Sequence, residues 1–76
     1  MIKSWSETTI NYRPVWKCQW ESAIITDPLD VELWMQEQIS GCYECSWGFD
    51  KQSGMFNLYI DITAANAATQ FKIRWS

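Results

Sequence analysis

The stretch "CYECSWGFDKQSGMFNLYIDIT", residues 42–63, decides the fold, because apolar and polar side chains alternate on both sides of a turn. Alternation with a period of two is typical of a strand that buries one face. If residues 50 and 55 close a hairpin around "KQSG", every apolar side chain falls on the same face. The predicted hairpin then contains the pairs Phe49–Phe56, Trp47–Leu58, Cys45–Ile60 and Tyr43–Ile62.

Three other segments favour strands. The segment "FKIRWS" (71–76) extends the same apolar face if it forms the pairs Ile62–Phe71, Ile60–Ile73 and Leu58–Trp75. In the N-terminal part, "PVWKCQWES" (14–22) alternates around Trp16 and Cys18 and predicts a strand from Val15 to about Ala23. The segment "TTINY" (8–12) predicts a further short strand, which Pro14 ends.

A helix is expected in "TDPLDVELWMQEQISG", residues 26–41. Asp27 is a good N-cap, Pro28 suits the first helical position, and Gly41 is a natural residue after the end. We therefore predict a helix from Pro28 to Ser40, with a buried stripe formed by Val31, Met35 and Ile39.

Together these elements predict one α+β domain over residues 1–76, in the order (β)βαβββ. It would be a two-layer domain with an antiparallel sheet of about four strands and one helix on its apolar face. A chain of this length buries only about 60% of its unfolded surface, so we expect a thin margin of stability. It begins with Met and contains no linker, which favours a complete small protein.

The absence of histidine limits the chemistry that this chain can perform. It excludes Ser-His-Asp and Cys-His catalysis and mixed Cys/His zinc sites within the chain. We therefore expect a protein that is not an enzyme and that carries no cofactor.

The charge is unevenly distributed along the chain, whose formal net charge is −3. No basic residue occurs between Lys17 and Lys51. That interval contains the acidic residues Glu21, Asp27, Asp30, Glu32, Glu37, Glu44 and Asp50. This balance disfavours a nucleic acid as the partner and favours a basic protein.

The predicted helix carries more apolar residues than one sheet face can cover, because Leu29 and Leu33 lie beside the buried stripe and Trp34 lies on its border. We predict a protein-interaction surface formed by Leu29, Asp30, Glu32, Leu33, Trp34 and Glu37. It would dock on a basic protein or on a second copy of the chain, as in a homodimer. One example of such a partner would be a nucleic-acid-binding enzyme, which the chain could regulate or inhibit by covering its basic surface.

The polar face of the predicted sheet offers an alternative of another class. The expected register brings together Glu44, Tyr59, Asp61, Lys72 and Arg74. Two neighbouring carboxylates are suited to binding a ligand or to general acid–base catalysis. These residues can equally be an ordinary row of exposed charges without a function, and we prefer this interpretation.

The pair Cys42-x-x-Cys45 suggests a third alternative, a metal or redox site. Residues three apart on a strand face opposite sides, and Cys18 alone does not complete a four-cysteine zinc site. We therefore expect the pair to bind no metal, with Cys18 and Cys45 as small core residues. The six tryptophans are mostly assigned to the core by the same pattern, which leaves Trp5 and Trp34 over.

The sequence also bears on location. It has no apolar run of the roughly 20 residues that a membrane helix needs, and no signal-peptide core follows "MIKSW". Its three cysteines are an odd number, which excludes a complete internal disulfide framework and favours a reducing cytoplasm. Acidic chains of this size without histidine are frequent among viral and bacterial accessory proteins, so we expect a cytoplasmic accessory regulator, in the host cytoplasm if viral.

Overall fold

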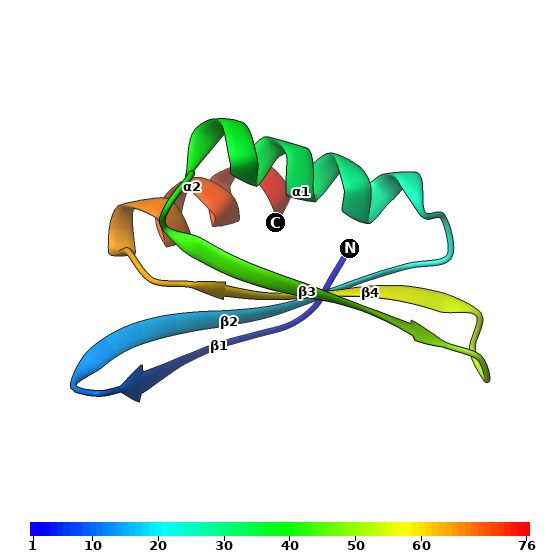
Figure 1. Ribbon diagram of the computed structural model, residues 1–76, viewed down its shortest axis with the longest axis horizontal. Coiled ribbons are helices and arrows are strands. Elements are labelled where there is room, and N and C mark those ends of the chain that lie inside the picture. The colour runs from blue at the N-terminus through cyan, green and yellow to red at the C-terminus, as the bar shows by residue number, and fades with distance from the viewer.

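The computed structural model describes residues 1–76 as two ββα units in succession. The elements are β1 (Ile2–Ile10), β2 (Arg13–Ser22), α1 (Thr26–Gln38), β3 (Tyr43–Asp50), β4 (Met55–Ile62) and α2 (Ala65–Trp75). The strands form one antiparallel sheet in the order β1-β2-β4-β3. Both helices lie on one side of this sheet, and the other side is uncovered (Figure 1). The predicted α+β class and four-stranded antiparallel sheet are confirmed, whereas the second helix was not expected.

The β3–β4 hairpin has the predicted register. Its pairs include Phe49 with Phe56, Cys45 with Ile60, and Asp50 with Met55 at the closed end. Gly54 adopts a positive φ of 73°, which glycine tolerates without strain, and its N–H donates to the carbonyl of Asp50 at 2.8 Å. A turn of this kind fixes the register of both strands, and the alternation of side chains then fixes their faces.

The predicted C-terminal strand is wrong, because residues 65–75 form α2. Ala67, Ala68 and Phe71 are buried at helical spacing, and alanine is the strongest helix former. Lys72 and Arg74 lie in the last turn, where positive charge is favourable next to the helix C-terminus. The alternate residues Phe71, Ile73 and Trp75 that favoured a strand do not share one buried face, because Ile73 is 80% exposed.

Strand β2 occupies the place beside β4 that the sequence assigned to the C-terminal segment. Its partners on the core face are Ile62 for Trp16, Ile60 for Cys18, and Leu58 for Trp20. Of the strand predicted over residues 8–12, residues 8–10 belong to a longer β1, and Pro14 lies inside β2. Asn11 and Tyr12 join the two strands with positive φ angles of 53° and 65°, the conformation of a two-residue hairpin loop.

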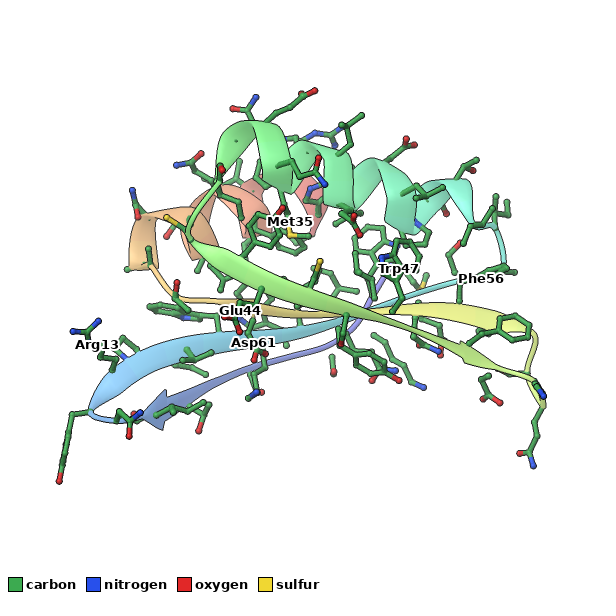
Figure 2. The ribbon with its side chains drawn as sticks, in the orientation of Figure 1. Arg13, Met35, Glu44, Trp47, Phe56 and Asp61 are labelled. Atoms are coloured by element: carbon green, nitrogen blue, oxygen red, sulfur yellow. The ribbon has the colours of Figure 1, made fainter.

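Helix α1 begins and ends two residues earlier than predicted. Asp27 lies in its first turn instead of at the N-cap, and it accepts a hydrogen bond of 2.9 Å from the Ser22 hydroxyl. Val31 and Met35 are fully buried, as their spacing predicts. Figure 2 shows Met35 between α1 and the sheet.

The core lies between the helices and the sheet, and aromatic rings join its parts. Trp5 stacks on Phe71 with ring centroids 5.8 Å apart, and Trp34 meets Phe71 edge-on at 6.1 Å. Trp75 contacts Trp20 edge-on at 5.4 Å. Phe71 thus binds α2 both to β1 and to α1. Neither helix has the length and apolarity required to cross a membrane.

Candidate interaction surface

The outer side of α1 carries two leucines that the fold does not bury. The side chains of Leu29 and Leu33 are 48% and 54% exposed. They lie one helical turn apart and off the stripe that Val31 and Met35 bury, because successive residues turn by about 100° around a helix. We call the set Leu29, Asp30, Leu33 and Glu37 the α1 flank.

The acidic residues of the α1 flank are not neutralised within the molecule. The two salt bridges of the whole molecule are Lys3–Glu21, at 3.0 Å, and Lys17–Asp61, at 3.2 Å, and neither includes a residue of the α1 flank. Asp30 and Glu37 are exposed and accept no side-chain hydrogen bond. The α1 flank therefore combines unburied apolar area with uncompensated negative charge.

Two predicted members of the surface have contacts inside the fold instead. Glu32 accepts a hydrogen bond of 2.6 Å from the indole N–H of Trp47, so its carboxylate faces β3. Trp34 is half-buried against α2, where it meets Trp75 edge-on at 6.2 Å as well as Phe71. We therefore leave Glu32 and Trp34 out of the α1 flank.

The contact between Glu32 and Trp47 gives a prediction for stability. Replacing Glu32 with alanine removes a hydrogen bond to a charged group, so we expect a loss of about 1–2 kcal/mol in the free energy of unfolding. Glu37→Ala, on the same helix, should change it by less than about 0.5 kcal/mol. Urea denaturation of both variants measures the difference. Equal losses would contradict a structural role for Glu32.

Strand β3 exposes two aromatic side chains on the same side of the molecule as Glu32. Trp47 and Phe49 are 40% and 54% exposed, although the pattern assigned both to the core face. Trp47 points toward α1 (Figure 2). The face was predicted correctly, but β3 is an edge strand, so these side chains lie at the rim of the core. The alternation of apolar and polar residues shows which face of the sheet a side chain occupies, but it does not show how close its strand lies to the edge of the sheet.

The open side of the sheet brings together part of the alternative polar site. Glu44 lies opposite Asp61 in the β3–β4 register, as predicted, and Tyr59 lies in the next row. With Lys17 they line a shallow cavity of about 300 Å³. Figure 2 shows Glu44 close to Asp61, with Arg13 some way off toward the β1–β2 turn.

The two basic residues predicted for the polar site lie elsewhere in the structure. Lys72 and Arg74 belong to α2, on the opposite side of the sheet, because the segment that carries them is helical. Lys17 occupies the predicted position of Lys72 next to Asp61. The sequence could have identified Lys17 from the alternation of β2, had β2 been paired with β4.

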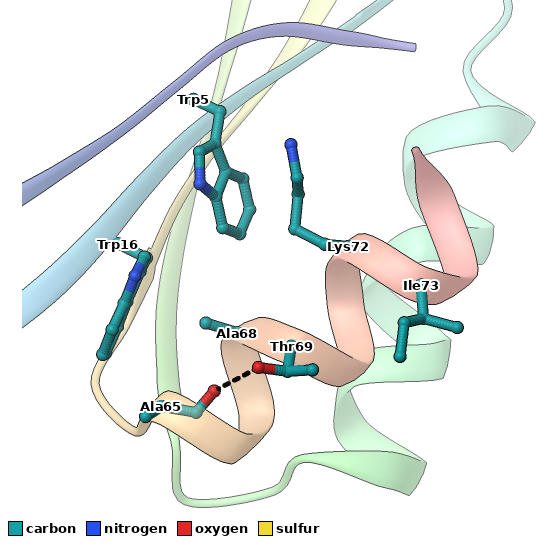
Figure 3. Close-up of a pocket in the computed structure, with 7 residues that line it drawn as sticks. All are labelled: Trp5, Trp16, Ala65, Ala68, Thr69, Lys72 and Ile73. Carbon is teal, nitrogen blue, oxygen red and sulfur yellow. Dashed lines mark hydrogen bonds between the residues drawn. The ribbon is translucent and has the colours of Figure 1, made fainter.

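A second hollow lies under α2 and was not expected from the sequence. It measures about 330 Å³ and is lined by Trp5, Trp16, Ala65, Ala68, Thr69, Lys72 and Ile73 (Figure 3). The Lys72 ammonium lies 4.8 Å from the centre of the Trp5 ring, within the range of a cation–π contact. This hollow exists only because residues 65–75 are helical.

The three cysteines are free. Cys18 and Cys45 both lie beside Ile60, on opposite sides of β4, so their Cα atoms are separated by about 10 Å, too far for a disulfide. Burial raises the pKa of the Cys18 thiol to about 11. Desolvation and the Glu32 carboxylate raise the pKa of Cys45 as well. No three side chains of His, Cys, Asp or Glu gather as metal ligands.

Comparisons with family models, with curated proteins and with solved structures found no match.

Proposed function

We propose that this chain is a small non-enzymatic interaction module that docks on a basic protein through the α1 flank. The observation that carries the proposal is the combination of exposed Leu29 and Leu33 with acidic neighbours that have no partner in the fold. Free thiols at all three cysteines further support a reducing compartment such as the cytoplasm.

The two kinds of side chain would act at different stages of binding. Asp30 and Glu37 would accelerate encounter with a basic surface, because complementary charges steer association. Leu29 and Leu33 would then contribute affinity as they leave water, at about 25 cal/mol for each Å² of apolar surface buried. Covering a basic surface in this way would regulate a partner that uses it for nucleic acid.

Site-specific photo-cross-linking in the cells that produce the protein tests this proposal. A photoreactive amino acid at position 33 should capture a basic protein. The same amino acid at position 73 is the matched control, because Ile73 is at least as accessible as Leu33 but lies on α2. Capture of the same proteins from both positions would contradict the proposal.

The captured protein then allows a quantitative test by calorimetry. Reversal of both charges, in Asp30→Lys with Glu37→Lys, should weaken binding at low salt by at least about tenfold, or 1.4 kcal/mol. The difference should shrink as salt screens exposed charges. Reversal of Glu7, an exposed acid on β1, should have little effect and serves as the control. Undiminished binding by the double variant would show that the α1 flank is not the docking surface.

A second candidate function is supported by the open sheet face. There Glu44 and Asp61 lie opposite each other beside the exposed Tyr59, in a cavity large enough for a small polar ligand. Glu44→Gln keeps the size of the side chain and removes its charge. It should abolish ligand binding or catalysis on this face and leave docking by the α1 flank unchanged.

A further inference from the structure

The two edges of the sheet differ in whether they can accept another strand. The order β1-β2-β4-β3 leaves one side of β1 and one side of β3 without a neighbouring strand. In β1, a register shift between Ile2 and Ser4 interrupts the pairing, and Lys3 adds a positive charge. Both features protect a natural edge from further pairing. Strand β3 has eight residues, an unbroken register, no proline and no basic residue.

The backbone groups that β3 presents outward can be identified from one hydrogen bond. The N–H of Thr63 donates to the carbonyl of Cys42 at 2.9 Å, which makes these residues a hydrogen-bonded pair. In an antiparallel ladder, hydrogen-bonded and non-hydrogen-bonded pairs alternate. The residues at positions 43, 45, 47 and 49 therefore direct their N–H and C=O groups away from β4. None of these groups is among the hydrogen bonds outside the regular elements.

The β3 edge is flanked by exposed aromatic side chains on its helix side, and the nearby chain segment is acidic. Exposed Trp47 and Phe49 lie on the helix side of β3, the side on which the α1 flank lies. Residues 26–50 contain acidic side chains and no basic one. The carboxylate of Asp50 accepts a hydrogen bond from the N–H of Gln52, which lowers its pKa and keeps it charged.

Charge favours a basic strand over a second copy at this edge, because β3 carries Glu44 and Asp50 and no basic residue. A second copy would add acids without a compensating cation, and in one of its registers the acids would lie directly opposite each other. In an antiparallel β3–β3 dimer centred on Trp47, Glu44 of each copy would lie opposite Asp50 of the other. Like charges placed directly opposite each other destabilise a strand pair. A strand that alternates basic and apolar residues avoids this repulsion and matches both the acids and the exposed rings.

We propose that β3 accepts an extended basic segment of the partner as a fifth strand, which pairs with the outward backbone groups of Cys45 and Trp47. This inference rests on the proposed function and specifies how that partner binds. Backbone hydrogen bonds would supply part of the affinity, and alternate side chains would supply specificity, as in other cases of strand addition. The side chains that face the helices would contact Trp47 and Phe49, the exposed aromatic residues of β3.

Nuclear magnetic resonance on the ¹⁵N-labelled wild-type protein tests the proposal. The probe is a peptide as long as β3, made of alternating lysine and valine with blocked ends and added at low salt. We expect hydrogen exchange at the amides of Cys45 and Trp47 to slow by at least about tenfold at saturation, because outward amides become bonded. The amides of β1 should exchange as before.

Two control peptides complete the design. The same peptide with N-methyl groups on adjacent central residues cannot pair through either edge, and we expect it to bind at least about tenfold more weakly. A peptide of alternating glutamate and valine should not bind.

Each other outcome overturns a defined part of the argument. Binding that shifts Leu29 and Leu33 but leaves the β3 amides exchanging freely would overturn strand addition and leave the proposed function standing. Protection of the β3 amides that grows with protein concentration alone would make a second copy the occupant. No binding by the lysine peptide at millimolar concentration would overturn strand addition, whereas the docking role of the α1 flank is decided by the cross-linking and charge-reversal experiments.

Discussion

Phe71→Ala should lower the free energy of unfolding by about 3–5 kcal/mol, a large part of the 5–15 kcal/mol that a native domain typically has. The side chain of Phe71 is fully buried, and its ring contacts those of Trp5 and Trp34. Its removal leaves a cavity between α2, α1 and β1. Urea denaturation followed by tryptophan fluorescence measures the loss, and we expect the variant to be partly unfolded at room temperature.

Ile73→Ala is the matched control for this experiment. If residues 71–76 were a strand, both side chains would face the core and both changes would be costly. In α2 they lie on different faces, and Ile73 is 80% exposed. The Ile73 variant should therefore lose less than about 0.5 kcal/mol. Comparable losses in the two variants would be incompatible with α2.

Raising the pH from about 9 to about 11 should cost about 2 kcal/mol of stability through the raised pKa of Cys18 alone. Burial favours the neutral thiol and raises its pKa from 9.0 to about 11. Below pH 9 the folded and unfolded chains both keep the proton, so the contribution of the thiol is complete. Between the two values the unfolded chain releases the proton while the folded chain retains it, and stability falls.

Cys18→Ala isolates this contribution from those of other groups. The pKa values of Tyr43 and Cys45 are raised as well, so the wild-type protein also loses stability through them at high pH. The difference between the wild type and Cys18→Ala, measured by urea denaturation across this pH range, should change by about 2 kcal/mol. Parallel profiles would mean that the thiol is accessible to water. An alkylating reagent provides a second measurement, because Cys18 should react only when the chain unfolds.

The part of the fold that the sequence predicts correctly is local. The β3–β4 hairpin was predicted residue by residue, because the turn "KQSG" fixes the register and the alternation fixes the face. The buried stripe of α1 was predicted from its 3.6-residue period for a similar reason. In both cases the information lies within a single element or between neighbours in the chain.

The errors concern contacts between distant segments. Phe71, Ile73 and Trp75 fit a strand as three alternate residues, whereas Ala67, Ala68 and Phe71 fit a helix, and only the longer pattern is correct. Because β4 was paired with the wrong neighbour, Lys72 was assigned to the position that Lys17 occupies. Alternation alone does not determine which of two amphipathic strands lies next to a third.

The candidate surface was predicted in part, for the same reason. Leu29 and Leu33 follow from the width of the apolar stripe on α1, which depends on the helix alone. The fates of Trp34 and Trp47 depend on α2 and on the position of β3 at the edge, which no local pattern reveals. Trp34 was expected to be exposed but packs against α2, and Trp47 was expected to be buried but lies at the rim of the core.

The sheet order β1-β2-β4-β3 also makes the two ββα units topologically equivalent, although their sequences share no repeat. Each unit places its second strand at the centre and its first strand at the edge. Each helix reaches the edge strand of the opposite unit, α1 through Glu32 and Trp47, and α2 through Phe71 and Trp5. The chain thus has the architecture of an isologous dimer whose protomers have been fused. Residues of both units form one core cluster, so we expect the two units to unfold together.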